Sequence, residues 1–144
     1  MENLILAPAS QAFLGLPEAD YPALASAKTL LIPFGLEASV SYQGGTSQGP
    51  EAIIKASQQV ELYDEELKLE AWPVIKPATL PLIKPERSLA KALPQLTNLV
   101  DKVLQLKKLP VILGGEHSIT PAIIAAMKKF YQNITILQID AHAD

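Results

Sequence analysis

Two short apolar runs in this chain end directly in clusters of polar residues. The first run, residues 111–113, leads into Gly114-Gly115-Glu116-His117-Ser118, and the second, residues 134–139, leads into Asp140-Ala141-His142-Ala143-Asp144. Short strands that are apolar throughout are typical of parallel sheets covered on both faces. Because ligands bind beyond the carboxyl ends of such strands, we expect both clusters to lie at one edge of a sheet.

The second cluster has the residue types and the spacing of a metal site. In an extended backbone Asp140, His142 and Asp144 point to the same face, because successive side chains alternate. Carboxylate and imidazole groups together suit hard or borderline divalent cations. An Asp after a strand is often only a helix cap or a turn former, but three such ligands on one face favour a metal site.

His117 is a weaker candidate when it is taken alone. A single His after a Gly-Gly turn is more often a hydrogen-bonded loop residue than a metal ligand. The chain has 2 histidines, however, and both lie in these two clusters. We therefore predict that His117 joins Asp140, His142 and Asp144 in one metal site.

These two clusters resemble the first two metal motifs of the ureohydrolases, the arginase and agmatinase family of binuclear manganese enzymes. A glycine-rich segment, residues 41–53, also resembles a segment near the family's N-terminus, and more that of agmatinases than that of arginases. The resemblance covers roughly residues 30–144. Position 116 departs mildly from the family, in which Asp is commoner there.

The resemblance implies a role for each ligand and two manganese ions in the complete enzyme. His117 would bind one ion, Asp140 would bridge both, His142 would bind the second ion, and Asp144 would be a second ligand of the first. Two further aspartate ligands of the family, its proton-shuttle histidine and its substrate-tail contacts have no match here. The catalytic residues are therefore unknown.

The implied activity is the hydrolysis of agmatine to putrescine and urea by an agmatinase-like enzyme. Another ureohydrolase, namely an arginase, a guanidinobutyrase or a formiminoglutamase, is an alternative that would differ in how it recognises the substrate tail. A third possibility is an inactive metal-binding fragment, because the later ligands are absent.

The implied fold is α/β, with three α/β/α layers around a mainly parallel sheet, as in arginases. We expect one incomplete domain over residues 1–144, in which residues 1–27 form an irregular N-terminal arm and residues 28–144 form the α/β portion. Because only the N-terminal half of the fold would be present, the strand at 134–139 should lack its later neighbours.

The remaining elements follow from apolar periodicity and from the prolines. Strands are expected at 29–34 and within 67–75, and a proline-rich connection through Pro77, Pro81 and Pro85. Helices are expected from Pro50 to about residue 60, from 89 to 103, and from 120 to about 131. The first should bury Ile53, Ile54, Ser57 and Val60, and Pro94 should either kink or start the second.

The glycine-rich loop at residues 43–49 precedes a helix, which is a common arrangement for binding anions. It contains no lysine and has neither a Walker nor a dinucleotide-binding spacing. We therefore expect a shaped loop near the rim of the active site rather than a phosphate site.

Composition excludes several other classes. There are 12 Lys+Arg against 15 Asp+Glu, which leaves no basic footprint for nucleic acid, and there is no cysteine for a disulfide or a thiolate metal site. The first basic residue is Lys28, and no apolar run approaches the ~18 residues of a membrane span. We expect a cytoplasmic homo-oligomer that acts on a small guanidinium substrate and binds neither nucleic acid nor membrane.

Overall fold

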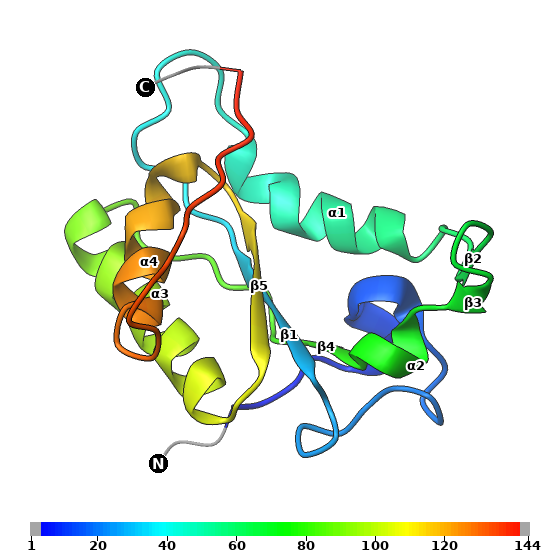
Figure 1. The fold of residues 1–144 in the computed structure, drawn as a ribbon. Coiled ribbons are helices and arrows are strands. Elements are labelled where there is room, and N and C mark those ends of the chain that lie inside the picture. The colour runs from blue at the N-terminus through cyan, green and yellow to red at the C-terminus, as the bar shows by residue number, and fades with distance from the viewer. Residues whose placement is uncertain (1–3, 142–144) are drawn as a thin grey trace.

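The fold is built on a parallel sheet of three strands in the order β4-β1-β5 (Figure 1). These strands are β1 (Thr29–Phe34), β4 (Pro77–Thr79) and β5 (Leu109–Gly114) in a computed structural model that describes residues 4–141. β1 pairs with β5 along its entire length and with β4 over its first three residues. All six residues of β1 are buried, as its apolar sequence predicted.

Helices cover both faces of this sheet. α1 (Gly49–Ser57) lies on one face, and α3 (Leu89–Gln105) packs with α4 (Thr120–Met127) on the other (Figure 1). The prediction of an α/β fold with three layers and a mainly parallel sheet is therefore confirmed.

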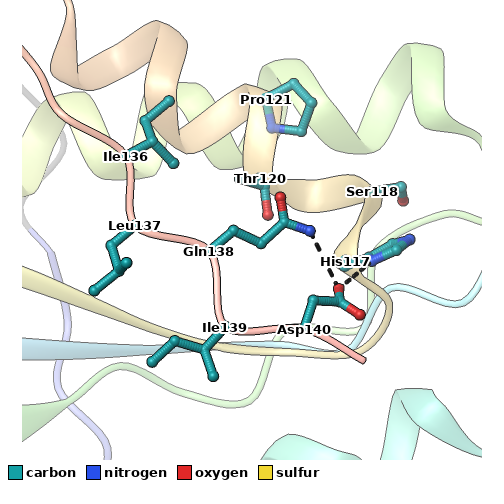
Figure 2. Close-up of a pocket in the computed structure, with 9 residues that line it drawn as sticks. All are labelled: His117, Ser118, Thr120, Pro121, Ile136, Leu137, Gln138, Ile139 and Asp140. Carbon is teal, nitrogen blue, oxygen red and sulfur yellow. Dashed lines mark hydrogen bonds and ion pairs between the residues drawn. The ribbon is translucent and has the colours of Figure 1, made fainter. Parts of the chain in front are cut away.

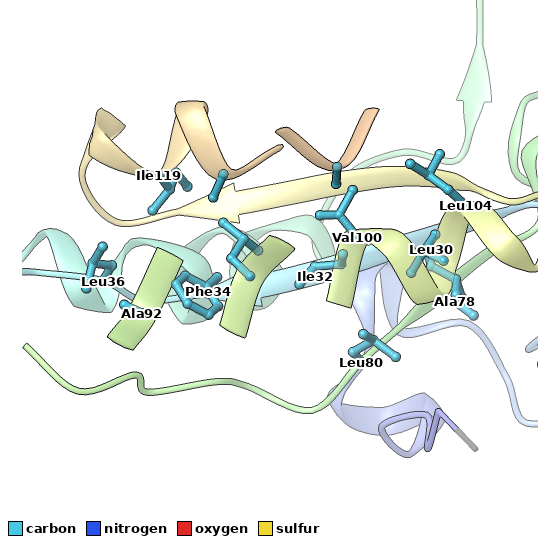
Figure 3. Close-up of a cluster of buried hydrophobic side chains, with 14 of the residues drawn as sticks. Leu30, Ile32, Phe34, Leu36, Ala78, Leu80, Ala92, Val100, Leu104 and Ile119 are labelled. Carbon is cyan, nitrogen blue, oxygen red and sulfur yellow. The ribbon is translucent and has the colours of Figure 1, made fainter. Parts of the chain in front are cut away.

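The core lies between β1 and α3 (Figure 3). Ile32 and Phe34 of β1 and Leu96 and Val100 of α3 are all fully buried. Full burial of one such side chain contributes about 1.5–3 kcal/mol. This apolar contact, which α3 makes through the periodic face predicted from the sequence, fixes the helix beneath the sheet.

The helices differ in detail from their predicted form. α1 buries Ile54 and Ser57 but leaves Ile53 exposed, and Val60 is exposed because the helix ends before it. α3 starts at Leu89 and contains Pro94 within it, so this proline does not start the helix. α4 ends at Met127, about a turn earlier than predicted.

The prediction of a strand within residues 67–75 is confirmed only by a strand of two residues, β3 (Leu69–Glu70). It pairs antiparallel with β2 (Tyr63–Asp64), which precedes this range, and a short helix, α2 (Trp72–Ile75), takes up the end of the range. The carboxylate of Asp64 accepts hydrogen bonds from the backbone N–H groups of two turn residues, which reverses the chain between the two strands.

The proline-rich connection contains a strand that the sequence analysis missed. Pro77 is the first residue of β4, a position where a missing N–H removes no necessary ladder bond. β4 is completely buried and lies beside the first half of β1.

The predicted strand at residues 134–139 is wrong for the structure as described. This segment runs past α4 without belonging to either sheet, and Leu137 and Ile139 are 84% and 92% exposed (Figure 1). A strand needs a neighbour to pair its N–H and C=O groups. Within residues 4–141, no strand pairs with it.

The N-terminal segment lies against the sheet and α1. It contains two short 3-10 turns, η1 (Ala9–Gln11) and η2 (Phe13–Gly15). The N–H of Phe13 donates to Thr79 Oγ1 at 3.0 Å, and the N–H of Leu14 donates to Ser57 Oγ at 2.9 Å. Among the helices of residues 4–141, none combines the length and apolar character needed to cross a bilayer.

Candidate metal centre

His117 and Asp140 meet beyond the carboxyl end of β5, although 23 positions separate them in the sequence. His117 Nδ1 lies 3.4 Å from Asp140 Oδ2 (Figure 2). The His117 side chain is 71% exposed, whereas that of Asp140 is 22% exposed. The structure thus brings together an accessible imidazole and a more enclosed carboxylate from the two polar clusters.

The turn after β5 presents His117 because it lies directly against the end of β1. The N–H of Gly115 donates to the carbonyl of Phe34 at 3.4 Å, and the N–H of Glu116 donates to that of Leu36 at 3.0 Å. A Cβ on Gly115 would lie 1.9 Å from the backbone oxygen of Leu36. Only glycine fits this approach, after which the short turn η4 (His117–Ile119) begins.

An open pocket of about 450 Å³ lies between this turn and the segment before Asp140 (Figure 2). Gln138, on the same segment, donates from Nε2 to Asp140 Oδ2 at 3.3 Å. This oxygen therefore lies between Gln138 and His117. The pocket is lined by His117, Ser118, Thr120, Pro121 and residues 136–140.

Glu116 is buried beside this pocket, with only 8% of its surface exposed. Its Oε2 accepts hydrogen bonds from the N–H groups of Ala38 and Ser39, each at 2.8 Å. Its Oε1 accepts from Ser39 Oγ at 2.8 Å and from Ser118 Oγ at 2.5 Å. Burial acts to raise the pKa of this carboxyl, but these four hydrogen bonds outweigh it and lower the pKa to about 2.

A second carboxylate, that of Glu37, holds the glycine-rich loop together by hydrogen bonds. Its Oε2 accepts from the N–H groups of Ser47 at 3.1 Å and Gly45 at 2.7 Å, and these bonds lower its pKa. Gly45 has a φ of 117°, a left-handed conformation that favours glycine. The loop donors that a phosphate would need are thus occupied by Glu37, which supports the prediction of a shaped loop.

Two predicted ligands, His142 and Asp144, lie outside the described residues. Within residues 4–141, no group of three or more His, Cys, Asp and Glu side chains could hold a metal ion. His117 and Asp140 supply imidazole nitrogen and carboxylate oxygen, and this donor set fits a divalent cation.

Sequence reasoning treated Glu116 only as a mild departure and missed its four hydrogen bonds. It also missed Glu37. One feature of the sequence could have drawn attention to Glu116, because it is a carboxylate next to a candidate metal ligand at the end of a buried strand. Its partners at Ala38 and Ser39, however, are far away in the sequence.

A sequence model of the arginase family matches residues 27–144. The chain belongs to the arginase family. The match covers both polar clusters and the glycine-rich loop, and therefore every segment on which the resemblance was based.

Curated relatives support this assignment. The chain is 34% identical over 126 residues to an N(1)-aminopropylagmatine ureohydrolase of Synechocystis sp., which covers 83% of this chain and 41% of that protein. It is 35% identical over 121 residues to an agmatinase of Halalkalibacterium halodurans, which covers 81% of this chain and 40% of that protein. The chain thus spans about two fifths of the length of these relatives.

Solved structures show the same fold. An agmatine ureohydrolase of Thermoplasma volcanium matches 81% of this chain and 38% of its own, with a TM-score of 0.70 at 22% identity. An arginase of Bacillus subtilis matches 74% of this chain and 36% of its own, with a TM-score of 0.58 at 30% identity.

Proposed function

We propose that this chain belongs to an agmatinase-like ureohydrolase with two manganese ions, which hydrolyses agmatine to putrescine and urea. The observation that carries the proposal is the meeting of His117 and Asp140 at the edge of an open pocket. Membership of the arginase family supports hydrolysis of a guanidino group, and relatives named agmatinase support the substrate.

His117, Asp140, His142 and Asp144 would hold the metal ions in this proposal. Carboxylate-rich sites without sulfur suit manganese. When bound, a pair of such ions lowers the pKa of a water molecule, so that hydroxide is available near neutral pH to attack the guanidinium carbon. The reaction adds the water oxygen to that carbon and breaks its bond to the alkyl nitrogen, which leaves as the amine while urea is released.

The described residues contribute orientation and apolar surface to this chemistry. Gln138 fixes one oxygen of Asp140, which limits how the carboxylate can rotate. The apolar walls of the pocket at Pro121 and Ile136 suit an alkyl chain. We expect the enzyme to work as a cytoplasmic homo-oligomer.

A second substrate deserves the same test. The relative from Synechocystis is named for N(1)-aminopropylagmatine, which carries a longer amine tail than agmatine, and a similar enzyme occurs in Thermus thermophilus. The two substrates share the reacting guanidinium, so His117 and Asp140 would serve both equally.

The deciding experiment measures urea release by the complete enzyme that would contain this chain, with manganese, from agmatine, N(1)-aminopropylagmatine and arginine. We expect one of the two agmatine compounds to be hydrolysed best, and His117→Asn and Asp140→Asn to lower the rate by at least about tenfold. Asp20→Asn, in an exposed turn, is a matched control with no expected effect. Preference for arginine would contradict the agmatinase proposal, and full activity of both variants would contradict the metal site.

A further inference from the structure

The carboxylate of Glu116 connects two segments that flank the candidate metal centre. One segment is the start of the loop between β1 and α1, which Glu116 reaches at Ala38 and Ser39. The other is the turn of His117 and Ser118, which it reaches through Ser118 Oγ at 2.5 Å. Ser118 itself lines the pocket (Figure 2).

The two oxygens of Glu116 divide these contacts. Oε2 accepts two backbone N–H groups of the loop, and Oε1 accepts the hydroxyls of Ser39 and Ser118. Each oxygen therefore makes two bonds, and the carboxylate is saturated by donors from both segments. A group that only filled space beside the turn would not need four oriented donors.

We propose that Glu116 is a positioning residue, which sets the turn of His117 and Ser118 in place by anchoring it to the loop at Ala38 and Ser39. This inference rests on the proposed function, since His117 is its candidate metal ligand. Residues that orient metal ligands through hydrogen bonds typically change metal affinity by about 10–100-fold when they are mutated.

The length of the side chain is specific to this role. Asp at position 116 would be shorter by one methylene and could not reach the loop and Ser118 together from the same backbone. Gln would keep the length, with one oxygen for the two N–H groups and an amide that donates to the two hydroxyls. Glu116→Gln should therefore preserve the anchor, whereas Glu116→Asp and Glu116→Ala should break it.

Glu37→Ala provides a matched control. Glu37 also accepts two backbone N–H groups of the same loop, at Gly45 and Ser47, but among residues 4–141 the hydrogen bonds and the ion pair of its carboxylate reach only this loop and Arg87. Its loss should release the far part of the loop without changing the affinity for metal.

The test combines hydrogen–deuterium exchange with a titration of manganese into the protein. For Glu116→Ala and Glu116→Asp we expect exchange at Ala38 and Ser39 to rise by about tenfold or more, and manganese affinity to fall by about 10–100-fold. Glu116→Gln should stay within about threefold of the wild type in both measurements. Ser39→Ala combined with Ser118→Ala, which removes both hydroxyl donors, gives a second test if Glu116→Ala fails to fold.

Unchanged manganese affinity in folded Glu116→Asp, or an equal loss of affinity in Glu37→Ala, would overturn the inference. Neither measurement depends on turnover. If the complete enzyme releases urea from no guanidino compound but the exchange and affinity results hold, the proposed function fails and the positioning role of Glu116 stands.

Discussion

The backbone of Gly115 lies so close to that of Leu36 that a Cβ on Gly115 would sit 1.9 Å from the Leu36 carbonyl oxygen. The clash is with backbone atoms, so no side chain can move to relieve it. We expect Gly115→Ala to cost about 3 kcal/mol or more in the free energy of unfolding and to displace the His117 turn.

Chemical denaturation of the two proteins checks this expectation. Gly44→Ala is the matched control, because its Cβ would meet only the end of the flexible Glu37 side chain, at 3.1 Å. Equal stabilities for Gly115→Ala and Gly44→Ala would show that the turn can shift away from Leu36 at little cost.

Manganese dependence is a direct consequence of the proposed ligand set. Chelation should abolish urea release by the complete enzyme, and manganese should restore it, since the four proposed ligands include no sulfur. Restoration by zinc but by neither manganese nor cobalt would speak against this assignment.

The number of ions that the chain can hold is a separate prediction. Its 144 residues include four of the six ligands that the family resemblance implies, with one bridging carboxylate instead of two. Two divalent cations about 4 Å apart repel strongly, even with an effective dielectric constant near 20. We expect the chain alone to bind at most one manganese ion firmly, as measured by equilibrium dialysis. We also expect it to release no urea. Two tightly bound ions or sustained turnover would refute this.

The loop between β1 and α1 should open in acid. Hydrogen bonds from Ser47 and Gly45 lower the pKa of Glu37 below its usual value of 4.5. The stabilising contribution of this carboxylate is therefore present above about pH 4.5 and is lost as the pH falls through its lowered pKa in the folded protein. Exchange at Gly45 and Ser47 should be constant from about pH 5 to 8, after correction for intrinsic rates, and should rise below pH 4; the same acid response in Glu37→Gln would contradict this cause.

Exposed apolar groups should make the chain associate with itself. Leu137 and Ile139 lie open to solvent, and β5 is an edge strand whose outer N–H and C=O groups have no strand beside them within residues 4–141. Replacing both side chains by Lys should lower the average mass measured by analytical ultracentrifugation. Ile5→Lys, which removes another exposed apolar group elsewhere, should not, and an equal effect would indicate non-specific association.

The sequence predicted correctly those elements whose order of apolar residues matches their burial in the folded protein. β1 and the buried face of α3 were correct because continuous or periodic burial leaves a direct trace in the order of apolar residues. β4 was missed because Pro77 reads locally as part of a connection, and only β1 beside it makes these residues a strand. The strand prediction for residues 134–139 was wrong for the opposite reason. Their apolar sequence suits a strand, but no described strand pairs with them.

The candidate site divides in the same way. The sequence predicted that both polar clusters follow strand ends, and the structure brings His117, at the end of β5, to Asp140, although residues 134–139 before Asp140 form no strand. Three of the four hydrogen bonds of Glu116 could not be predicted, because they depend on how the loop at Ala38 and Ser39 returns to the end of β5.

The separation of Glu116 from Ser39 along the chain also constrains the order in which the protein can fold. We expect Glu116 to meet Ser39 only after β1 has paired with β5, because a contact between such distant residues has a loop-closure cost and forms slowly. The loop and the His117 turn therefore acquire their final shape together, and only after the sheet has formed. On the ribosome the β1 segment is made long before β5, its partner, and the turn that follows β5, so metal capture should report a late event in folding.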